Sequence, residues 1–165
     1  LGYQLFSIGN RADSAALVYQ VDYVLDGYVK KAGTNFVLSV GRLIGSQPEL
    51  KGEQRLRKED IYWEMPRCYQ WDITVNLPES YRISPEGLER LNVKVENDCG
   101  AFIVQATTED GTLRIKAEKR INHKTEPVAN WEKLLEITDA ANSYEALSIV
   151  FQATINPPTS PTTGY

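Results

Sequence analysis

Residues 69–77 have the sequence Tyr-Gln-Trp-Asp-Ile-Thr-Val-Asn-Leu, in which apolar or aromatic side chains occupy every odd position and polar side chains every even position. Successive side chains of a β-strand point to opposite faces, so this period of two predicts a strand with one dry face and one wet face. The same alternation recurs along most of the chain. We therefore expect a mainly β fold.

The composition is that of a soluble globular protein. The 165 residues are 42% hydrophobic and 24% charged, which is ordinary for one domain. Nine Tyr and three Trp favour strands, because flat aromatic side chains suit a pleated surface. The net charge of −4 gives a nucleic-acid-binding role no electrostatic support. No apolar run approaches the roughly 18–20 residues that span a bilayer, so we expect no transmembrane segment.

The start of the chain and its cysteines bear on the cellular compartment. The chain begins Leu-Gly-Tyr, so we expect a fragment or a processed form, and the lack of a signal peptide says nothing about export. Cys68 and Cys99 are too few to mark a disulfide-stapled scaffold. We expect two separate thiols, with pairing in an oxidising compartment as the alternative.

The first third of the chain predicts a hairpin. Two apolar-rich stretches, Ala15–Lys31 and Asn35–Ile44, flank a short segment that contains Gly33. Glycine adopts positive φ at little cost, so we expect the turn at Gly33. A helix through residues 20–31 is the alternative, because the apolar side chains there also fall on one helical face. Residues 46–60 are polar and charged, and predict a solvated loop that leads into an edge strand.

The middle of the chain predicts a succession of strands. Ile61, Trp63 and Met65 share one face of a first strand, and the strand 69–77 follows. It stops at Pro78, because proline cannot donate to a β-ladder. Residues 78–87 contain two prolines and a glycine, and predict a loop.

Three further segments predict an antiparallel meander. Residues 91–95, 102–106 and 113–117 alternate between apolar and polar side chains. The turn-type clusters Asn97–Gly100 and Glu109–Gly111 separate them, and the Asp-Gly pair in the second cluster is a strong hairpin signal.

One helix is expected near the C-terminus, over about residues 129–144. Asn130 is a favourable N-cap residue, and an apolar stripe follows that includes Trp131 and Leu134. A final strand is predicted at about 147–153, and the Pro/Thr-rich residues 154–165 predict a flexible tail. The whole pattern predicts one antiparallel β-sandwich-like domain over residues 1–153, with the helix packed on the sheet.

The sequence offers no strong catalytic constellation. Cys99, His123 and Asp139 follow the chain order of a papain-like triad, but a nucleophilic thiol needs a lowered pKa. Cys99 instead follows Asp98, whose charge would raise that pKa. As the only histidine, His123 cannot supply the usual pair of imidazoles to a metal, and no EF-hand spacing or phosphate-binding glycine motif occurs. We expect no catalytic residue, cofactor or metal in this chain.

Aromatic side chains raise the possibility of a platform for sugar or peptide. Strand parity assigns Trp63 and Trp71 to dry faces, which favours a place in the core over a platform, and Tyr69 shares the face of Trp71. Tyr62 lies on the wet face beside Glu64. A small basic cluster comprises Arg55, Arg57 and Lys58. The interface candidates are two residues of this cluster, Arg55 and Arg57, together with Tyr62 and Glu64.

Several sequence blocks carry a family resemblance through their order and spacing: Val29–Phe36, Gly41–Gln47, Arg57–Ile61, Leu77–Tyr81, Asn97–Phe102 and Trp131–Ala141. Over roughly residues 15–153 the chain resembles the C-terminal β domain of large secreted bacterial proteins. Those proteins carry an N-terminal β domain of unknown function and a central transglutaminase-like, papain-fold domain. The resemblance implies export to the periplasm or cell envelope, with neighbouring domains of the same polypeptide as partners.

The resemblance assigns no catalytic residue to this chain, because the Cys, His and Asp of the family's active centre belong to the preceding domain. We therefore expect a non-catalytic accessory domain that docks on the transglutaminase-like domain or positions its substrate. The alternative is an autonomous β-sandwich module that binds glycan or peptide.

Overall fold

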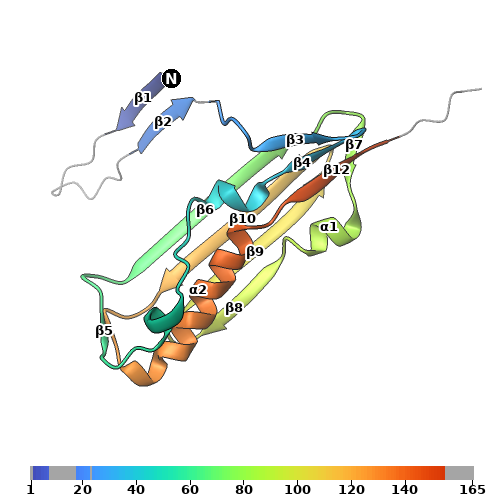
Figure 1. The fold of residues 1–165 in the computed structure, drawn as a ribbon. Coiled ribbons are helices and arrows are strands. Elements are labelled where there is room, and N and C mark those ends of the chain that lie inside the picture. The colour runs from blue at the N-terminus through green and yellow to red at the C-terminus, as the bar shows by residue number, and fades with distance from the viewer. Residues whose placement is uncertain (1, 8–17, 23, 155–165) are drawn as a thin grey trace, which may run out of the picture.

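The computed structural model describes residues 2–7, 18–22 and 24–154, whose strands form antiparallel sheets (Figure 1). A long sheet has the strand order β6-β10-β9-β8 and comprises β6 (Arg67–Asn76), β10 (Thr112–Ile121), β9 (Gly100–Glu109) and β8 (Val93–Asn97). A short sheet has the order β3-β4-β12-β7 and comprises β3 (Val29–Ala32), β4 (Asn35–Leu38), β12 (Ile149–Ala153) and β7 (Tyr81–Ile83). Two further pairs join β1 (Gly2–Ser7) to β2 (Val18–Asp22) and β5 (Ile61–Tyr62) to β11 (Thr125–Glu126).

The helical elements include one long helix, α2 (Trp131–Glu145), which a 3₁₀ turn, η3 (Val128–Asn130), precedes. The shorter ones are η1 (Val40–Ile44), η2 (Gly52–Arg55) and α1 (Pro85–Glu89). Within the described ranges, no helix combines the length and apolar character that crossing a membrane requires.

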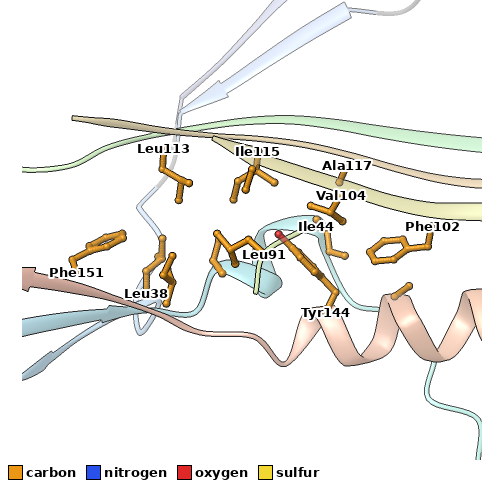
Figure 2. Packing of buried hydrophobic residues seen from close by; sticks show 14 of the residues in the cluster. Leu38, Ile44, Leu91, Phe102, Val104, Leu113, Ile115, Ala117, Tyr144 and Phe151 are labelled. Atoms are coloured by element: carbon orange, nitrogen blue, oxygen red, sulfur yellow. The ribbon is translucent and has the colours of Figure 1, made fainter. Parts of the chain in front are cut away.

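The layers form because one face of the long sheet is apolar and must be covered. Helix α2 packs over β8 and β9, and the short sheet covers the same face nearer the β9–β10 turn (Figure 1). Figure 2 shows Leu113 and Ile115 of β10 facing Leu38 of β4 and Phe151 of β12 across this core. Each fully buried side chain of this size contributes about 1.5–3 kcal/mol. The expected β-sandwich-like fold with a C-terminal helix on the sheet is confirmed.

The predicted meander is also confirmed. Strands β8, β9 and β10 pair antiparallel in sequence order, and the β9–β10 ladder runs without a shift. Asp110 and Gly111 have φ values of 48° and 72°, which suit the two-residue turn that the Asp-Gly signal predicts. In β6 the side chains of Trp71, Ile73 and Val75 are half-buried whereas the even positions are exposed, so the alternation in residues 69–77 was interpreted correctly.

The predicted N-terminal hairpin is correct in its turn and wrong in its arms. Gly33 has φ +63° and joins β3 to β4. The first arm divides into β2 and β3 around Gly27 (φ +73°), and β2 pairs with β1. No helix forms in the described part of residues 20–31, so that alternative is wrong.

The end of the predicted second arm is η1, where a close approach prevents a strand. The Gly41 N–H donates to the Leu147 carbonyl (3.1 Å), and a Cβ at Gly41 would lie 1.8 Å from the Tyr144 carbonyl oxygen. Gly41 therefore lies against the backbone at the C-terminal end of α2, in a site that only a glycine fits.

Other predicted boundaries differ because short elements depend on distant partners. Residues 78–87 contain β7 and α1 rather than a loop alone, and Ser84 caps α1 by accepting from the Gly87 N–H (3.0 Å). The first central strand shrinks to β5, because its partner β11 has two residues, and Met65 is exposed. Asn130 does not cap α2; its side chain bonds Glu126 instead. The final strand begins at Ile149, and residues 155–165 of the predicted tail lie outside the described residues.

The contact at Gly41 gives a test of the fold. We expect Gly41→Ala to destabilise the protein by more than about 3 kcal/mol, because the new Cβ overlaps a backbone carbonyl that cannot move without shifting α2. Gly33→Ala is the matched control: its position is open, so only the positive φ costs, about 1 kcal/mol. Urea denaturation measures both. Equal losses of stability would show that Gly41 does not lie against α2.

Candidate binding site

A groove of about 520 Å³ lies beside β6 on the inner face of the long sheet, and we call it the aromatic groove. Helix α2 packs mainly over β8 and β9, so the start of β6 lies outside its cover, whereas Ile121 at the end of β10 packs against the cluster of Ile61, Cys99 and Leu134. The loop after η1 forms the opposite wall of the groove. Its lining residues come from the end of η1, the loop after it, the segment before β6, the two strands and one position of α2: Ile44, Ser46, Gln47, Pro48, Trp63, Arg67, Tyr69, Trp71, Lys119, Ile121 and Thr138.

Three aromatic side chains shape this groove. Tyr69 and Trp71 are two residues apart on β6, so both point to the inner face, and their rings stack with centroids 6.1 Å apart and planes at 22°. Trp63 reaches the groove from the segment after β5, where its backbone N–H donates to the Lys124 carbonyl (2.8 Å). Stacked and half-exposed rings offer large apolar surfaces at which a ligand can pack.

Two cations stand at the same end of the groove. Lys119 pairs in register with Tyr69, and its Nζ donates to Gln47 Oε1 (2.9 Å). Burial lowers the pKa of Lys119, because a charged ammonium loses hydration there. Arg67, at the start of β6, is exposed. Neither forms an ion pair with a described carboxylate, so the groove presents positive charge beside its aromatic surface.

The expectation that Trp63 and Trp71 belong to the core is therefore only half correct. Trp71 packs against the main core cluster, and Trp63 packs against the smaller cluster of Ile61, Cys99 and Leu134. Both side chains are nevertheless half-buried and line the groove. A period of two identifies which face a side chain occupies, but not whether another element covers that face.

Two of the four interface candidates serve to hold α2. Arg55 forms a bidentate ion pair with Asp139 (2.8 and 2.7 Å), and its carbonyl accepts from Trp131 Nε1 (2.8 Å). The Arg57 guanidinium lies 5.5 Å from the centre of the Trp131 ring. The pairing with Arg55 holds the pKa of Asp139 below its usual value.

The other two candidates, Tyr62 and Glu64, are exposed near β5. Lys124 Nζ lies 5.1 Å from the centre of the Tyr62 ring. None of the four candidates lines the aromatic groove. Sequence reasoning therefore missed Lys119 and Arg67; the one available signal was a lysine on the apolar parity of β10.

A second cluster surrounds Glu126, whose side chain is 2% exposed. The carboxylate accepts from His123 Nδ1 (2.5 Å) and Asn130 Nδ2 (2.7 Å), and the buried Cys99 thiol lies beside it. Burial raises the pKa of Cys99, and the neighbouring Glu126 charge raises it further. A carboxylate thus stands where an activating imidazole would be needed, and the thiol stays protonated.

Of the three residues in triad order, Asp139 is held elsewhere by Arg55, whereas Cys99 and His123 meet through Glu126. No pattern in the sequence distinguishes Glu126 from the other acidic residues, of which the chain has 22 in total. No group of three or more potential metal ligands occurs within the described residues.

Residues 40–151, about two thirds of the chain, match the family described as "Domain of Unknown Function with solved-structure structure (DUF3858)". The chain belongs to the DUF3858 family. The match covers the long sheet, α2 and the aromatic groove. No curated protein and no solved structure shows a significant match to the chain.

The environments of the two thiols predict different reactivities. In the native DUF3858 domain at pH 8 we expect a thiol reagent to modify exposed Cys68 rapidly and Cys99 only on unfolding, because Cys99 is buried with a raised pKa. Cys68→Ser should abolish the fast phase. Rapid modification of Cys99 in the folded Cys68→Ser variant would contradict the arrangement around Glu126.

Glu126 predicts a pH dependence of stability. Burial alone would raise the pKa of Glu126, but hydrogen bonds from Asn130 and His123 outweigh it, and the net pKa lies below 4.5. Because the pKa of Glu126 is lower in the folded state, its carboxylate stabilises the protein at pH values above the unfolded-state pKa. This contribution is lost as the pH falls through the folded-state pKa. We expect Glu126→Gln to lower the free energy of unfolding by about 1–3 kcal/mol at pH 7 and by less in acid.

Urea titrations at pH 7 and pH 3 measure that difference. Glu64→Gln, at an exposed position, should stay within about 0.5 kcal/mol of the unsubstituted protein. A Glu126→Gln effect that is the same at both pH values would contradict the assignment.

Proposed function

We propose that this DUF3858 domain is a non-catalytic accessory domain of a larger secreted bacterial protein, in which it holds a substrate segment for a transglutaminase-like neighbour. The aromatic groove is the observation that carries the proposal. The sequence blocks that resemble such proteins supply the neighbouring domain and the location in the periplasm or cell envelope.

The groove has the properties of a binding site. Its volume of about 520 Å³ lies within the usual range of ligand sites, roughly 300–1,000 Å³. Trp63, Tyr69 and Trp71 supply apolar surface, and Lys119 and Arg67 supply an electrostatic preference. A half-buried lysine without a carboxylate partner costs stability, and such costs are typical of sites kept for binding.

The Cys99 cluster supports a non-catalytic role. A nucleophilic cysteine needs an accessible thiolate beside a base, whereas Cys99 is fully buried beside a carboxylate that raises its pKa. Cleavage or cross-linking of a peptide library by the isolated chain would contradict this role if Cys99→Ala or Cys68→Ala abolished that activity.

The same groove favours a second candidate function, an autonomous module that binds glycan or peptide. Its half-exposed aromatic rings would serve either ligand without a neighbouring domain. The two functions differ in one respect: the accessory role requires that loss of groove binding also weakens the parent protein's turnover of its substrate.

Array binding tests the groove. We expect the 165-residue chain to bind members of a peptide or glycan array, and Trp71→Ala to weaken this binding at least about tenfold, because one of the three aromatic rings of the groove is lost. Tyr62→Ala is the matched control, since it removes an exposed aromatic ring outside the groove.

Two outcomes would refute a binding role for the groove. One is that the folded chain binds no member of the array. The other is that Trp71→Ala and Tyr62→Ala weaken the binding equally. Circular dichroism of both variants establishes that each is folded.

A further inference from the structure

Strand β6 is the longest edge strand of the two four-stranded sheets. It has ten residues, pairs with β10 on one side, and pairs with no described strand on the other. The Leu77 N–H donates to the Gly111 carbonyl (2.8 Å), which continues the β6–β10 ladder by one position. Hydrogen-bonded pairs alternate along an antiparallel ladder, so the odd residues of β6 bond β10. The N–H and C=O groups of the even residues, from Cys68 to Asn76, therefore face the free edge.

The other sheet edges carry features that discourage pairing. The edge strand β7 has three residues, β3 has four and includes Lys30 and Lys31, and β8 has five with Lys94 and Glu96 directed outward. Short length and charge are the usual protections of an edge.

Strand β6 lacks most of these protections. It contains neither lysine nor proline, and its register with β10 runs from Arg67 to Asn76 without a bulge. Asp72 is the only charge after Arg67. An edge of this length that stays regular and open is suited to accept another strand.

The aromatic groove lies next to this open edge. A strand added to β6 would place alternate side chains on the inner face, beside Tyr69 and Trp71, and the others on the polar outer face. We propose that β6 binds an extended peptide as an added strand, whose inner-face side chains enter the aromatic groove and include a carboxylate held by Arg67 and Lys119. This inference rests on the proposed function and specifies its substrate as an acidic, extended segment of polypeptide.

Charge favours a peptide over a second copy of the chain. The inner-face residues of β6 include no acid, so pairing with a second β6 would leave Arg67 and Lys119 without a counter-charge. A peptide also satisfies the alternating N–H and C=O groups of the edge, which a glycan cannot match at strand spacing.

Fluorescence anisotropy with a labelled ten-residue peptide tests the proposal. The probe alternates Thr and Val, with one central Glu among its inner-face residues, and is compared with the Gln and Lys versions. We expect the Glu probe to bind at least about tenfold more tightly than the Lys probe. Lys119→Met should reduce that preference.

A backbone substitution on the edge tests strand addition itself. Asp72→Pro removes an outward N–H without removing a bond to β10, and we expect it to weaken probe binding at least about tenfold. The matched control Asp72→Ala removes the same side chain but keeps the N–H, and should change binding less than about twofold.

N-methylated probes give the same test if Asp72→Pro does not fold. Methyl groups on one alternate set of probe nitrogens should abolish binding, and those on the other set should leave it unchanged. If N-methylation of either alternate set reduces binding equally, or if neither set reduces it, strand addition is wrong.

The outcomes separate this inference from the proposed function. If Trp71→Ala abolishes binding but Asp72→Pro and N-methylation do not, the groove binds a ligand and strand addition is wrong. If the probe does not bind and arrays retain nothing, both proposals fail. A dimer in solution that Asp72→Pro dissociates would identify a second copy as the occupant and overturn the peptide proposal.

Discussion

The inner face of β10 is apolar and must be buried, and the layers of the molecule follow from this requirement. Leu113, Ile115 and Ala117 are 0–4% exposed, and they lie at the centre of the long sheet with β6 on one side and β9 on the other. The short sheet and α2 cover these positions together, as Figure 2 shows. Two residues further along the strand, on the same face, the core gives way to Lys119. The aromatic groove begins at this point, because α2 crosses β8 and β9 but not the adjacent end of β6.

The position of α2 connects the core to the groove. Arg55 and Trp131 fix the helix to the segment before β5, Glu126 fixes its start through Asn130, and Gly41 allows η1 to pack against its end. These contacts hold the helix over one half of the sheet. The short sheet covers the far end of the other half, and the part between the two covers retains half-buried tryptophans and a lysine with a lowered pKa. Such departures from a well-packed core are expected where a protein keeps a surface for a partner.

Local signals in the sequence predicted much of the fold. The alternation in residues 69–77, the Asp-Gly turn and the apolar stripe after Asn130 each act over a few neighbouring residues, and each element formed nearly where expected. The misses depend on distant partners. Strand β5 is short because β11 is short, and η1 replaces a strand because Gly41 meets α2. The groove could not be predicted, since parity gives the face of Trp71 but not what lies above it, and the role of Arg55 depends on Asp139, 84 positions away.

Hydrogen exchange along β6 in the unliganded protein shows whether this strand is an open edge in a fixed register. We expect slow exchange for the odd amides, which bond β10, and fast exchange for the even amides, which face the free edge: Trp71, Ile73 and Val75 against Gln70, Asp72 and Thr74. Uniformly slow exchange would mean that another strand already covers the edge. Reversal of the two sets would mean a register shifted by one residue, and either result would show that β6 is not an open edge in this register.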